Sequence, residues 1–302
     1  FMQRASLPSS FGMSNITPWA NIGKVDNRGV DISVDYNKAF SKDLILSLRG
    51  SFTYAHNEVV EMDEPAYKWD YLSKVGHPIN SINCLIAEGL FESEEDIANW
   101  PKQDFGTVRP GDIKYRDVNG DGVVNNYDRA AVGNPRTPEI QYGIPVGLSY
   151  KGFDFSMLWQ GSALCSVQLS GPAVWDFPLY DQSRTGKVRK MHLNRWTPET
   201  AATATYPALH YGIHNNNKQQ YSSLFLYDAS YIRLKNVEIG YTLPKAWTSK
   251  AGIQSVRIYA QGQNLLTFDR LGDVDMDPEI KNGDGSWFPV QRVVNLGINM
   301  TF

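Results

Sequence analysis

The sequence has little of several features that point to common protein classes. Only two of its 302 residues are cysteine, Cys84 and Cys165, which is too few for a disulfide scaffold and shows no metal-ligand spacing. We expect both to be ordinary buried or lumen-facing thiols. No run of about 18 apolar residues occurs, which excludes a transmembrane helix. The 29 basic and 32 acidic residues nearly cancel, to a net charge of −3. Nucleic-acid binding normally shows as a basic surplus, so we expect no nucleic-acid partner.

Signatures of catalysis are also missing. His210 and His214 lie on one short stretch, but that stretch lacks the glutamate of a zinc protease motif. We find no nucleophile elbow, phosphate loop or dinucleotide fingerprint. We therefore expect no catalytic residues and no enzyme activity. A charged-then-apolar leader is absent too, and Phe1 is not an initiator residue, so we expect the chain to begin inside a longer protein or after processing.

The strongest signal that is present is a period-two alternation of apolar and polar residues, which is typical of strands. In the segment 140–150, for example, Val146 and Leu148 alternate with Gly147 and Ser149. The alternation is less regular after Asp228, where we expect a bulge near Asn236. The strands that we expect cover 30–36, 44–54, 140–150, 153–163, 229–243, 255–268 and 290–302.

The connections between these strands alternate in length. The short connections are 37–43, 151–152 and 244–254, and the long ones are 55–137, 164–228 and 269–289. Soluble β-sandwiches also alternate, but a compact soluble domain seldom tolerates long structureless loops. Bacterial outer-membrane barrels normally have short periplasmic turns and long external loops. The sequence therefore predicts an all-β fold, a transmembrane antiparallel β-barrel with long extracellular loops.

Strand parity puts the three long connections on one side of the membrane and Phe302 at the periplasmic rim, provided that 79–91 belongs to an external excursion. Seven crossings are fewer than the minimum of about eight for a bacterial single-chain barrel, so we expect further strands to be needed for closure. The alternating apolar side chains should face lipid and the opposite side a polar lumen. The expected lipid-facing residues are Val30, Ile32, Val34, Leu46, Leu48, Ile144, Val146, Leu148, Phe155, Met157, Leu296 and Ile298.

Several segments resemble a known family along nearly the whole chain and in the family's own order. They are NIGKVDNRGVDISVDYN (21–37), GDIKYRDVNGDGVVNNYDRAAVGNPRTPEIQYG (111–143), YKGFDFSMLWQG (150–161), DASYIRLKNVEIGYTLP (228–244), RIYAQGQNLLTF (257–268) and VNLGINMTF (294–302). They resemble SusC/RagA-type transporters, the TonB-dependent outer-membrane importers of Bacteroidota. By this resemblance, residues 1–302 are the C-terminal part of the barrel, without the plug, the TonB box and the early strands.

The resemblance implies a barrel of about 22 strands in the bacterial outer membrane, with a plugged lumen. It also implies a SusD-like lipoprotein that covers the extracellular mouth, energy from TonB through the missing N-terminal part, and import of oligosaccharides or peptides. Phe302 resembles the terminal aromatic residue by which outer-membrane barrels are recognised for insertion. The alternative for Phe302 is a strand that simply ends in an apolar residue.

Residues 117–128 have the oxygen spacing of a calcium loop, with Gly122 at the sharp turn. An EF-hand normally has a bidentate glutamate at position 12, and the shorter Asp128 makes the loop more like the dockerin type. The alternative is a turn-rich loop that binds no metal. The expected Ca²⁺ ligands are Asp117, Asn119, Asp121, the Val123 carbonyl, Asn125 through water, and Asp128.

The long connections hold many aromatic residues, which are candidates for binding a glycan because sugar rings present apolar C–H faces. They are equally suited to packing the loops together or to contacting a lipoprotein lid. The candidate substrate-binding residues are Trp69, Trp175, Tyr180, Tyr211 and Trp287. A soluble β-rich carbohydrate-binding module with a structural calcium loop is the competing function, but the amphipathic strand at 290–302 favours the membrane.

Overall fold

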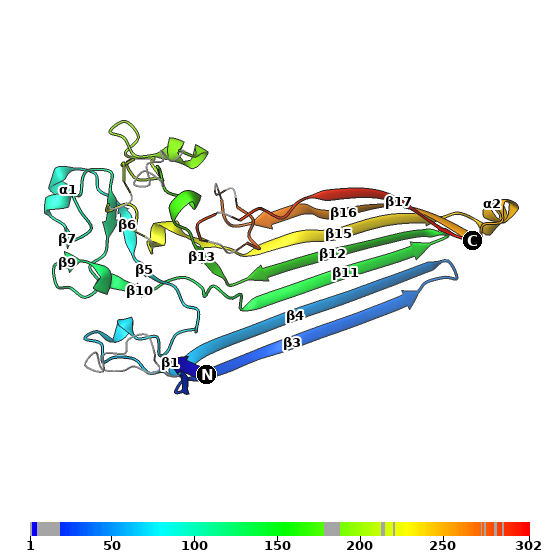
Figure 1. Cartoon of the computed structure of the whole chain (residues 1–302), viewed down its shortest axis with the longest axis horizontal. Coiled ribbons are helices and arrows are strands. Elements are labelled where there is room, and N and C mark those ends of the chain that lie inside the picture. The colour runs from blue at the N-terminus through cyan, green and yellow to red at the C-terminus, as the bar shows by residue number, and fades with distance from the viewer. Residues whose placement is uncertain are drawn as a thin grey trace.

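The main feature of the fold is a sheet of seven antiparallel strands that run side by side along the long axis of the molecule (Figure 1). The computed structural model describes residues 2–4, 19–177, 188–212, 215–219, 221–272, 274, 276–280, 283–285 and 287–302. The sheet order is β17-β16-β15-β12-β11-β4-β3, so each strand pairs with its neighbours in chain order. The strands are β3 (Lys24–Ala39), β4 (Leu44–Glu61), β11 (Ile140–Tyr150), β12 (Phe153–Ala163), β15 (Tyr231–Thr242), β16 (Ser255–Asp269) and β17 (Val293–Thr301).

The seven strands expected from the alternation are confirmed, with β3 and β4 longer than predicted. Pairing continues to Ala39, opposite Ile45, so the turn is shorter than the predicted 37–43. The register shifts between Leu234 and Asn236, where the sequence predicted a bulge. The link between β11 and β12 has positive φ at both Lys151 (46°) and Gly152 (86°), as a two-residue primed hairpin turn requires.

The strand register gives the sheet one apolar and one polar face, because paired residues on neighbouring strands point to the same side. One row across the sheet is Leu46, Leu148, Phe155, Ile239, Ala260 and Leu296. The adjacent row is Ser47, Gly147, Ser156, Glu238, Gln261 and Asn295. The predicted division into a lipid-facing and a lumen-facing side therefore matches the observed register.

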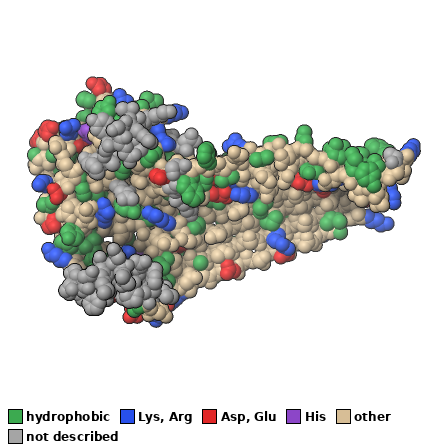
Figure 2. Space-filling model, viewed as in Figure 1, with side chains coloured by type: hydrophobic (Ala, Val, Ile, Leu, Met, Phe, Trp, Pro, Cys, Tyr) green, Lys and Arg blue, Asp and Glu red, His purple; other side chains and the backbone are tan. Residues whose placement is uncertain are grey.

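Large side chains on the apolar face are exposed. Val294 is 72% exposed, Leu296 84% and Ile298 58%. Apolar side chains also gather at the end of the sheet where β16 and β17 meet the short helix α2 (Lys245–Thr248) (Figure 2). If this face lay in water, the protein would lose a stabilising free energy of roughly 25 cal/mol for each Å² of apolar area left unburied. Among the described residues, no helix is both long and apolar enough to cross a membrane.

All three long connections lie at the other end of the sheet, where they form one folded unit that we call the loop body (Figure 1): the described residues of 62–139, 164–230 and 270–292. The sequence suggested that these connections lack regular structure, but they contain short strands. Their strands are β5 (Asn83–Leu85), β6 (Ala87–Leu90), β7 (Lys102–Gln103), β8 (Ile113–Tyr115), β9 (Val123–Val124), β10 (Arg129–Ala131), β13 (Ser166–Gln168) and β14 (Leu226–Asp228). The described part of the loop body also contains the α-helix α1 (Glu94–Ala98).

Single turns of 3-10 helix occur throughout the loop body and next to α2. They are η2 (Asp70–Leu72), η3 (Asn126–Asp128), η4 (Gly171–Ala173), η6 (Lys190–Asn194), η7 (Ser223–Phe225) and η8 (Ser249–Ala251). Near the N-terminus, β1 (Met2–Arg4) pairs with β2 (Trp19–Asn21) in a separate two-stranded ribbon. The segment 79–91 contributes β5 and β6 to small sheets of the loop body and does not join the seven strands, as parity required.

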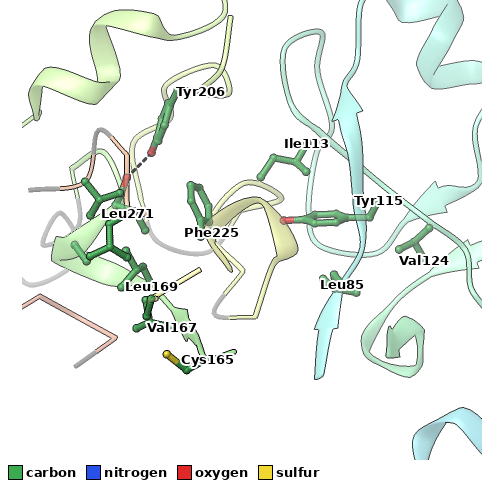
Figure 3. Packing of buried hydrophobic residues seen from close by; sticks show 14 residues of the cluster. Leu85, Ile113, Tyr115, Val124, Cys165, Val167, Leu169, Tyr206, Phe225 and Leu271 are labelled. Carbon is green, nitrogen blue, oxygen red and sulfur yellow. Dashed lines mark hydrogen bonds between the residues drawn. The ribbon is translucent and has the colours of Figure 1, made fainter. Parts of the chain in front are cut away.

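The loop body has its own hydrophobic core, and every long connection contributes to it. Leu85, Ile113 and Tyr115 come from the first connection, Phe225 from the second and Leu271 from the third (Figure 3). Each of these five side chains is at most 2% exposed. Both cysteines are buried, and Cys84 Sγ donates a hydrogen bond to Gln168 Oε1 at 3.0 Å. The long connections are therefore fixed to one another by packing.

Because neighbouring residues of β11 point to opposite faces of the sheet, an introduced charge should cost much more stability on the apolar face than on the polar face. Leu148→Arg puts a guanidinium on the apolar face, three residues before the Lys151-Gly152 turn, and should destabilise the barrel by up to about 2–4 kcal/mol, the cost at mid-membrane. Ser149→Arg points to the polar face, beside Asp154, and should cost little by this mechanism. Urea unfolding of the intact protein in lipid vesicles measures both variants. Equal penalties at the two positions contradict a membrane-facing role for the apolar side.

Candidate functional site: the loop body and its junction with the sheet

The predicted calcium loop is a tight turn held by side-chain oxygens. Asp117 accepts hydrogen bonds from the backbone N–H groups of Gly120 and Gly122, at 2.7 and 2.8 Å. Asn119 Oδ1 accepts from Asp121 N, and Asp121 Oδ1 from Val123 N, at 2.8 and 2.9 Å. These bonds hold residues 117–123 in a tight turn.

Asp128 has a different environment from the other candidate ligands. Its side chain is fully buried, and its two oxygens accept from the backbone N–H groups of Val118, Asn119 and Asn125. Asp128 therefore closes the loop by joining its two ends. Within the described part of the chain, no three His, Cys, Asp or Glu side chains are grouped as a metal site would group them. A Ca²⁺ ion here would need Asn119, the Val123 carbonyl and water as further oxygen donors.

The candidate substrate-binding aromatics do not share one environment. Trp69 is half-buried and contacts Tyr127, with ring centroids 5.7 Å apart, and Trp175 packs against the hydrophobic core. Tyr211 is 65% exposed and stacks on Phe177 at 4.5 Å. Trp287 is 70% exposed and lines a cavity at the sheet junction. Tyr180 lies outside the described residues.

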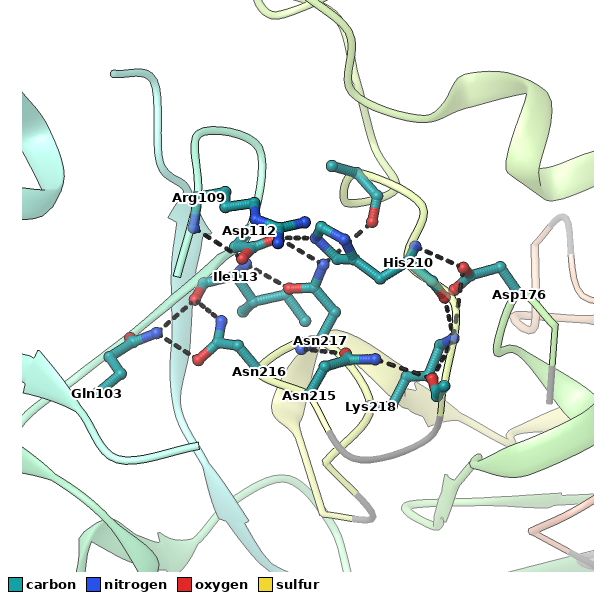
Figure 4. A network of polar contacts seen from close by, with 12 residues as sticks. Gln103, Arg109, Asp112, Ile113, Asp176, His210, Asn215, Asn216, Asn217 and Lys218 are labelled. Atoms are coloured by element: carbon teal, nitrogen blue, oxygen red, sulfur yellow. Dashed lines mark hydrogen bonds and ion pairs between the residues drawn. The ribbon is translucent and has the colours of Figure 1, made fainter. Parts of the chain in front are cut away.

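A buried polar network joins the first and second long connections (Figure 4). His210 Nε2 lies 2.6 Å from Asp112 Oδ1, and Asn217 Nδ2 donates to the same carboxylate at 2.8 Å. The Lys218 side chain is 1% exposed, and its Nζ lies 3.4 Å from Asp176 Oδ2. Breaking a buried pair of this kind leaves an uncompensated charge, so the network fixes how the two connections sit together.

Two further groups of this region are held in their neutral forms. His192 Nδ1 accepts from Arg189 N at 2.9 Å, and Nε2 lies 3.0 Å from Val174 O. Burial lowers the pKa of His192, because water cannot solvate the charged form of the buried ring. Burial, with the nearby Asp176 carboxylate, raises the pKa of Tyr206, whose hydroxyl donates to Val174 O. Burial also raises the pKa of Cys84 to about 12, so this thiol is not a reactive one.

The third long connection is fastened to the polar face of the sheet by a cluster of charges that we call the arginine staple. Arg233, on β15, is 2% exposed and donates to Asp277 Oδ1 and Glu279 Oε2, both at 2.8 Å. Its Nε donates to Thr267 on β16 at 2.9 Å. Lys235 also donates to Glu279, at 2.9 Å. The segment around residues 277–279 is therefore drawn onto the polar face at its loop end.

Two cavities, each of about 530 Å³, lie beside the staple. The first, the hydroxyl cavity, is lined on the sheet by Ser51, Thr53, Gln141, Gln160 and Ser162, and by Glu279 from the staple. The second, the arginine cavity, is lined by Arg189, Arg233, Thr267, Asp277, Trp287 and Arg292. Both volumes are within the range of small-molecule sites. The junction between loop body and polar face thus offers space for a ligand.

Sequence reasoning missed the staple and the buried network. Arg233 looks like one more polar residue of an alternating strand, and Asp277 and Glu279 like solvated loop carboxylates. The available signal was the parity of β15, which places Arg233 on the lumen side, together with the Asp-x-Glu pair in a long loop. Asp112 and His210 are 98 residues apart and have no common motif.

Removing the staple should release the third connection. Arg233→Ala leaves Asp277 buried without its cation and Glu279 with Lys235 alone, and it should destabilise the fold by about 3–5 kcal/mol. Arg270→Ala is the matched control, because Arg270 is 75% exposed and its pair with Asp228 should be worth at most about 1 kcal/mol. Chemical unfolding with hydrogen exchange across 276–292 measures both. Unchanged exchange in the Arg233 variant contradicts this role of the staple.

No family model matches the chain, but individual relatives do. TonB-dependent receptor P3 of Formosa agariphila is 26% identical over 324 aligned residues, covering 98% of this chain and 30% of the relative. TonB-dependent receptor SusC of Bacteroides thetaiotaomicron is 24% identical over 288 residues, covering 93% of this chain and 27% of the relative. The relatives named here are receptors rather than enzymes.

Solved structures show the same fold. The RagAB peptide transporter matches all of this chain and 32% of its own, with a TM-score of 0.72 at 21% identity. The RagAB peptide importer in the closed-closed state matches with a TM-score of 0.70 at 22% identity and the same coverage. The seven strands are thus part of an all-β barrel wall. The chain is a relative of the SusC/RagA-type TonB-dependent receptors and spans less than a third of their length.

Proposed function

We propose that this chain forms the C-terminal barrel wall and the extracellular loops of a TonB-dependent importer in the bacterial outer membrane. The observation that carries the proposal is the division of the molecule into a two-faced sheet and a loop body at one end of it (Figure 1). The exposed apolar face matches the lipid-facing side of a barrel, and the polar face its lumen. The similarity to TonB-dependent receptors supports the same assignment.

The cargo that we propose is a glycan or a peptide, received at the loop body with a SusD-like surface lipoprotein. Exposed aromatics such as Tyr211 and Trp287 offer contact surfaces to a lid or to cargo. The similar RagAB is a peptide transporter. Energy from TonB would enter through parts of the protein outside this chain.

The competing function is a soluble carbohydrate-binding module with a structural calcium loop. Such a module would leave the apolar row of Leu148, Phe155 and Leu296 in water, together with the unpaired edges of β3 and β17. A barrel covers the row with lipid and pairs the edges with further strands. The transporter is therefore the proposal that we prefer.

We also propose that the loop 117–128 binds Ca²⁺ as a structural ion. Its donors are carboxylate and amide oxygens, which are the ligands that a hard cation prefers. Asp117, Asn119 and Asp121 accept backbone N–H groups of the turn, and an oxygen that accepts one N–H group still has a second lone pair for a metal. The ion would lock this loop within the loop body, far from the lipid.

The proposed sidedness predicts which positions can be labelled on whole cells. The segment 201–203 is exposed in the loop body, so a short tag there should react with an external reagent. A tag that replaces Lys151-Gly152, at the opposite end of the sheet, should not react. Asn216 would be a poor site for the tag because it is 1% exposed within the buried network. The reverse labelling pattern would invert the topology and refute the proposed function.

The calcium proposal predicts a metal-dependent stabilisation of 113–131. At about 100 times the dissociation constant, Ca²⁺ should stabilise this segment by about 2.7 kcal/mol, seen as roughly 100-fold slower hydrogen exchange in the intact receptor. Asp121→Asn should abolish the calcium effect, whereas Asp70→Asn, elsewhere in the loop body, should keep it. Asp128→Asn should loosen the loop even without metal, because it closes the turn. Exchange that is insensitive to calcium in the unaltered protein contradicts the site.

A further inference from the structure

The arginine cavity lies where cargo would pass if the proposed function holds. Arg233 pairs across the sheet with Gln160 on one side and Thr267 on the other, so all three residues share the polar face. The cavity has a volume of about 530 Å³ between this face and the segment 276–292 of the loop body. It is therefore a hollow at the mouth of the proposed lumen.

The charges that line the arginine cavity are of two kinds. Arg233 is already paired, because its guanidinium donates to Asp277, Glu279 and Thr267. Arg189 and Arg292 are different: neither guanidinium forms an ion pair with any side chain that the structure describes. Asp277 is also occupied, since Oδ1 accepts from Arg233 and Oδ2 from Val290 N at 3.3 Å.

The balance of free charge in the cavity is therefore positive. Asp269 is the one lining carboxylate outside the staple among the described residues, and its Oδ1 already accepts from Leu271 N at 3.0 Å. The lining thus holds two such guanidinium groups, those of Arg189 and Arg292, and this single carboxylate. Guanidinium groups bind carboxylates through paired, charge-assisted hydrogen bonds.

The cavity also has a flat apolar surface held in a defined place. Trp287 lines it and is 70% exposed, and Pro289 lies next to it in the lining. The chain directly after them is fastened by two hydrogen bonds: Val290 N donates to Asp277, and Asn264 Nδ2 donates to Gln291 O at 3.0 Å. A ligand group entering the cavity would meet cations beside an aromatic face that is already positioned.

The hydroxyl cavity, on the other side of the staple, has a different chemistry. Its sheet lining includes Ser51, Thr53, Gln141, Gln160 and Ser162, which carry hydroxyl and amide groups, and no cation is among its described lining residues. Glu279 is its one lining carboxylate among the described residues and is held by Arg233 and Lys235. Two neighbouring cavities of equal size thus differ in whether they offer free positive charge.

We infer that the arginine cavity is a cargo-binding subsite for a carboxylate, bound by Arg189 and Arg292 while Trp287 packs against the group that carries it. This inference rests on the proposed function, because it assigns the acid group of the cargo to that same mouth. The carboxylate comes from an acidic sugar or from an acidic peptide, and the two sources share this chemistry. The hydroxyl cavity is left for uncharged polar parts of the cargo.

The test compares acids with their neutral counterparts on the intact receptor that contains this chain. The probes are trigalacturonate against its methyl ester, and triglutamate against triglutamine with both peptides N-acetylated and C-amidated, measured by calorimetry in detergent. At least one acid should bind about 10-fold or more tightly than its neutral counterpart, and this preference should weaken as salt rises. Binding of one acid alone identifies the source of the carboxylate. Equal affinities within both pairs, or no acid binding, overturn the inference.

Variants assign the preference to the two arginines. Arg189→Gln with Arg292→Gln should lower the affinity for the acid by about 10-fold or more, to the level of its neutral counterpart. The pair Arg189→Lys and Arg292→Lys keeps the charge and should retain part of the preference, which separates loss of binding from loss of folding. Arg28→Gln is the control, because Arg28 is an exposed arginine on β3, at the opposite edge of the sheet. A preference that survives the glutamine substitutions overturns the inference.

An uptake assay separates this inference from the proposed function. If cells that carry the intact receptor take up no cargo through it, the proposed function fails. If they take up cargo but the preference for acids does not depend on Arg189 and Arg292, the proposed function stands and only the arginine subsite fails. Neutral cargo should enter equally well in the glutamine variants.

Discussion

The pairing of backbone groups between long strands is the constraint on which the rest of this structure depends. In lipid every N–H and C=O group needs an internal partner, and only a closed barrel supplies one for each residue of a strand. The seven strands satisfy one another along their shared edges, from β3 to β17. Once that pairing is in place, the side chains must alternate between lipid and lumen. The apolar row through Leu148 and the polar row through Gly147 are direct consequences.

The long connections lie outside the lipid, so they need another source of order than the membrane, and the loop body supplies it. Long connections normally lose too much conformational entropy to hold one shape. Here the burial of apolar side chains in a shared core offsets that loss, and Tyr115, Phe225 and Leu271 in this core come from three different connections. The buried pairs Asp112–His210 and Asp176–Lys218 add directional contacts that simple packing lacks. Such a body can present a surface of fixed shape above the barrel.

The parts of this architecture that sequence reasoning reached are those with local periodicity. The alternation of apolar and polar residues predicted each strand, and an interruption of the alternation predicted the bulge near Asn236. The fold of the long connections was missed because its contacts are remote in sequence. Arg233 and Asp277 are 44 residues apart, and no spacing rule links them. The candidate calcium loop was proposed from the spacing of its oxygens, but the closing role of Asp128 became visible only from its three backbone donors.

The arginines at the sheet junction show how one residue type serves two purposes. A buried ion pair is a poor source of net stability, because desolvation offsets much of its attraction. The staple is therefore better explained as a positional device, which sets where the segment carrying Trp287 stands on the polar face. Arg189 and Arg292, a short distance along the same lining, have no such internal partners among the described residues. Because Arg233 takes up Asp277 and Glu279, those carboxylates are unavailable to its neighbours. The staple thus fixes the geometry of the cavity and leaves its remaining guanidinium groups free for a ligand.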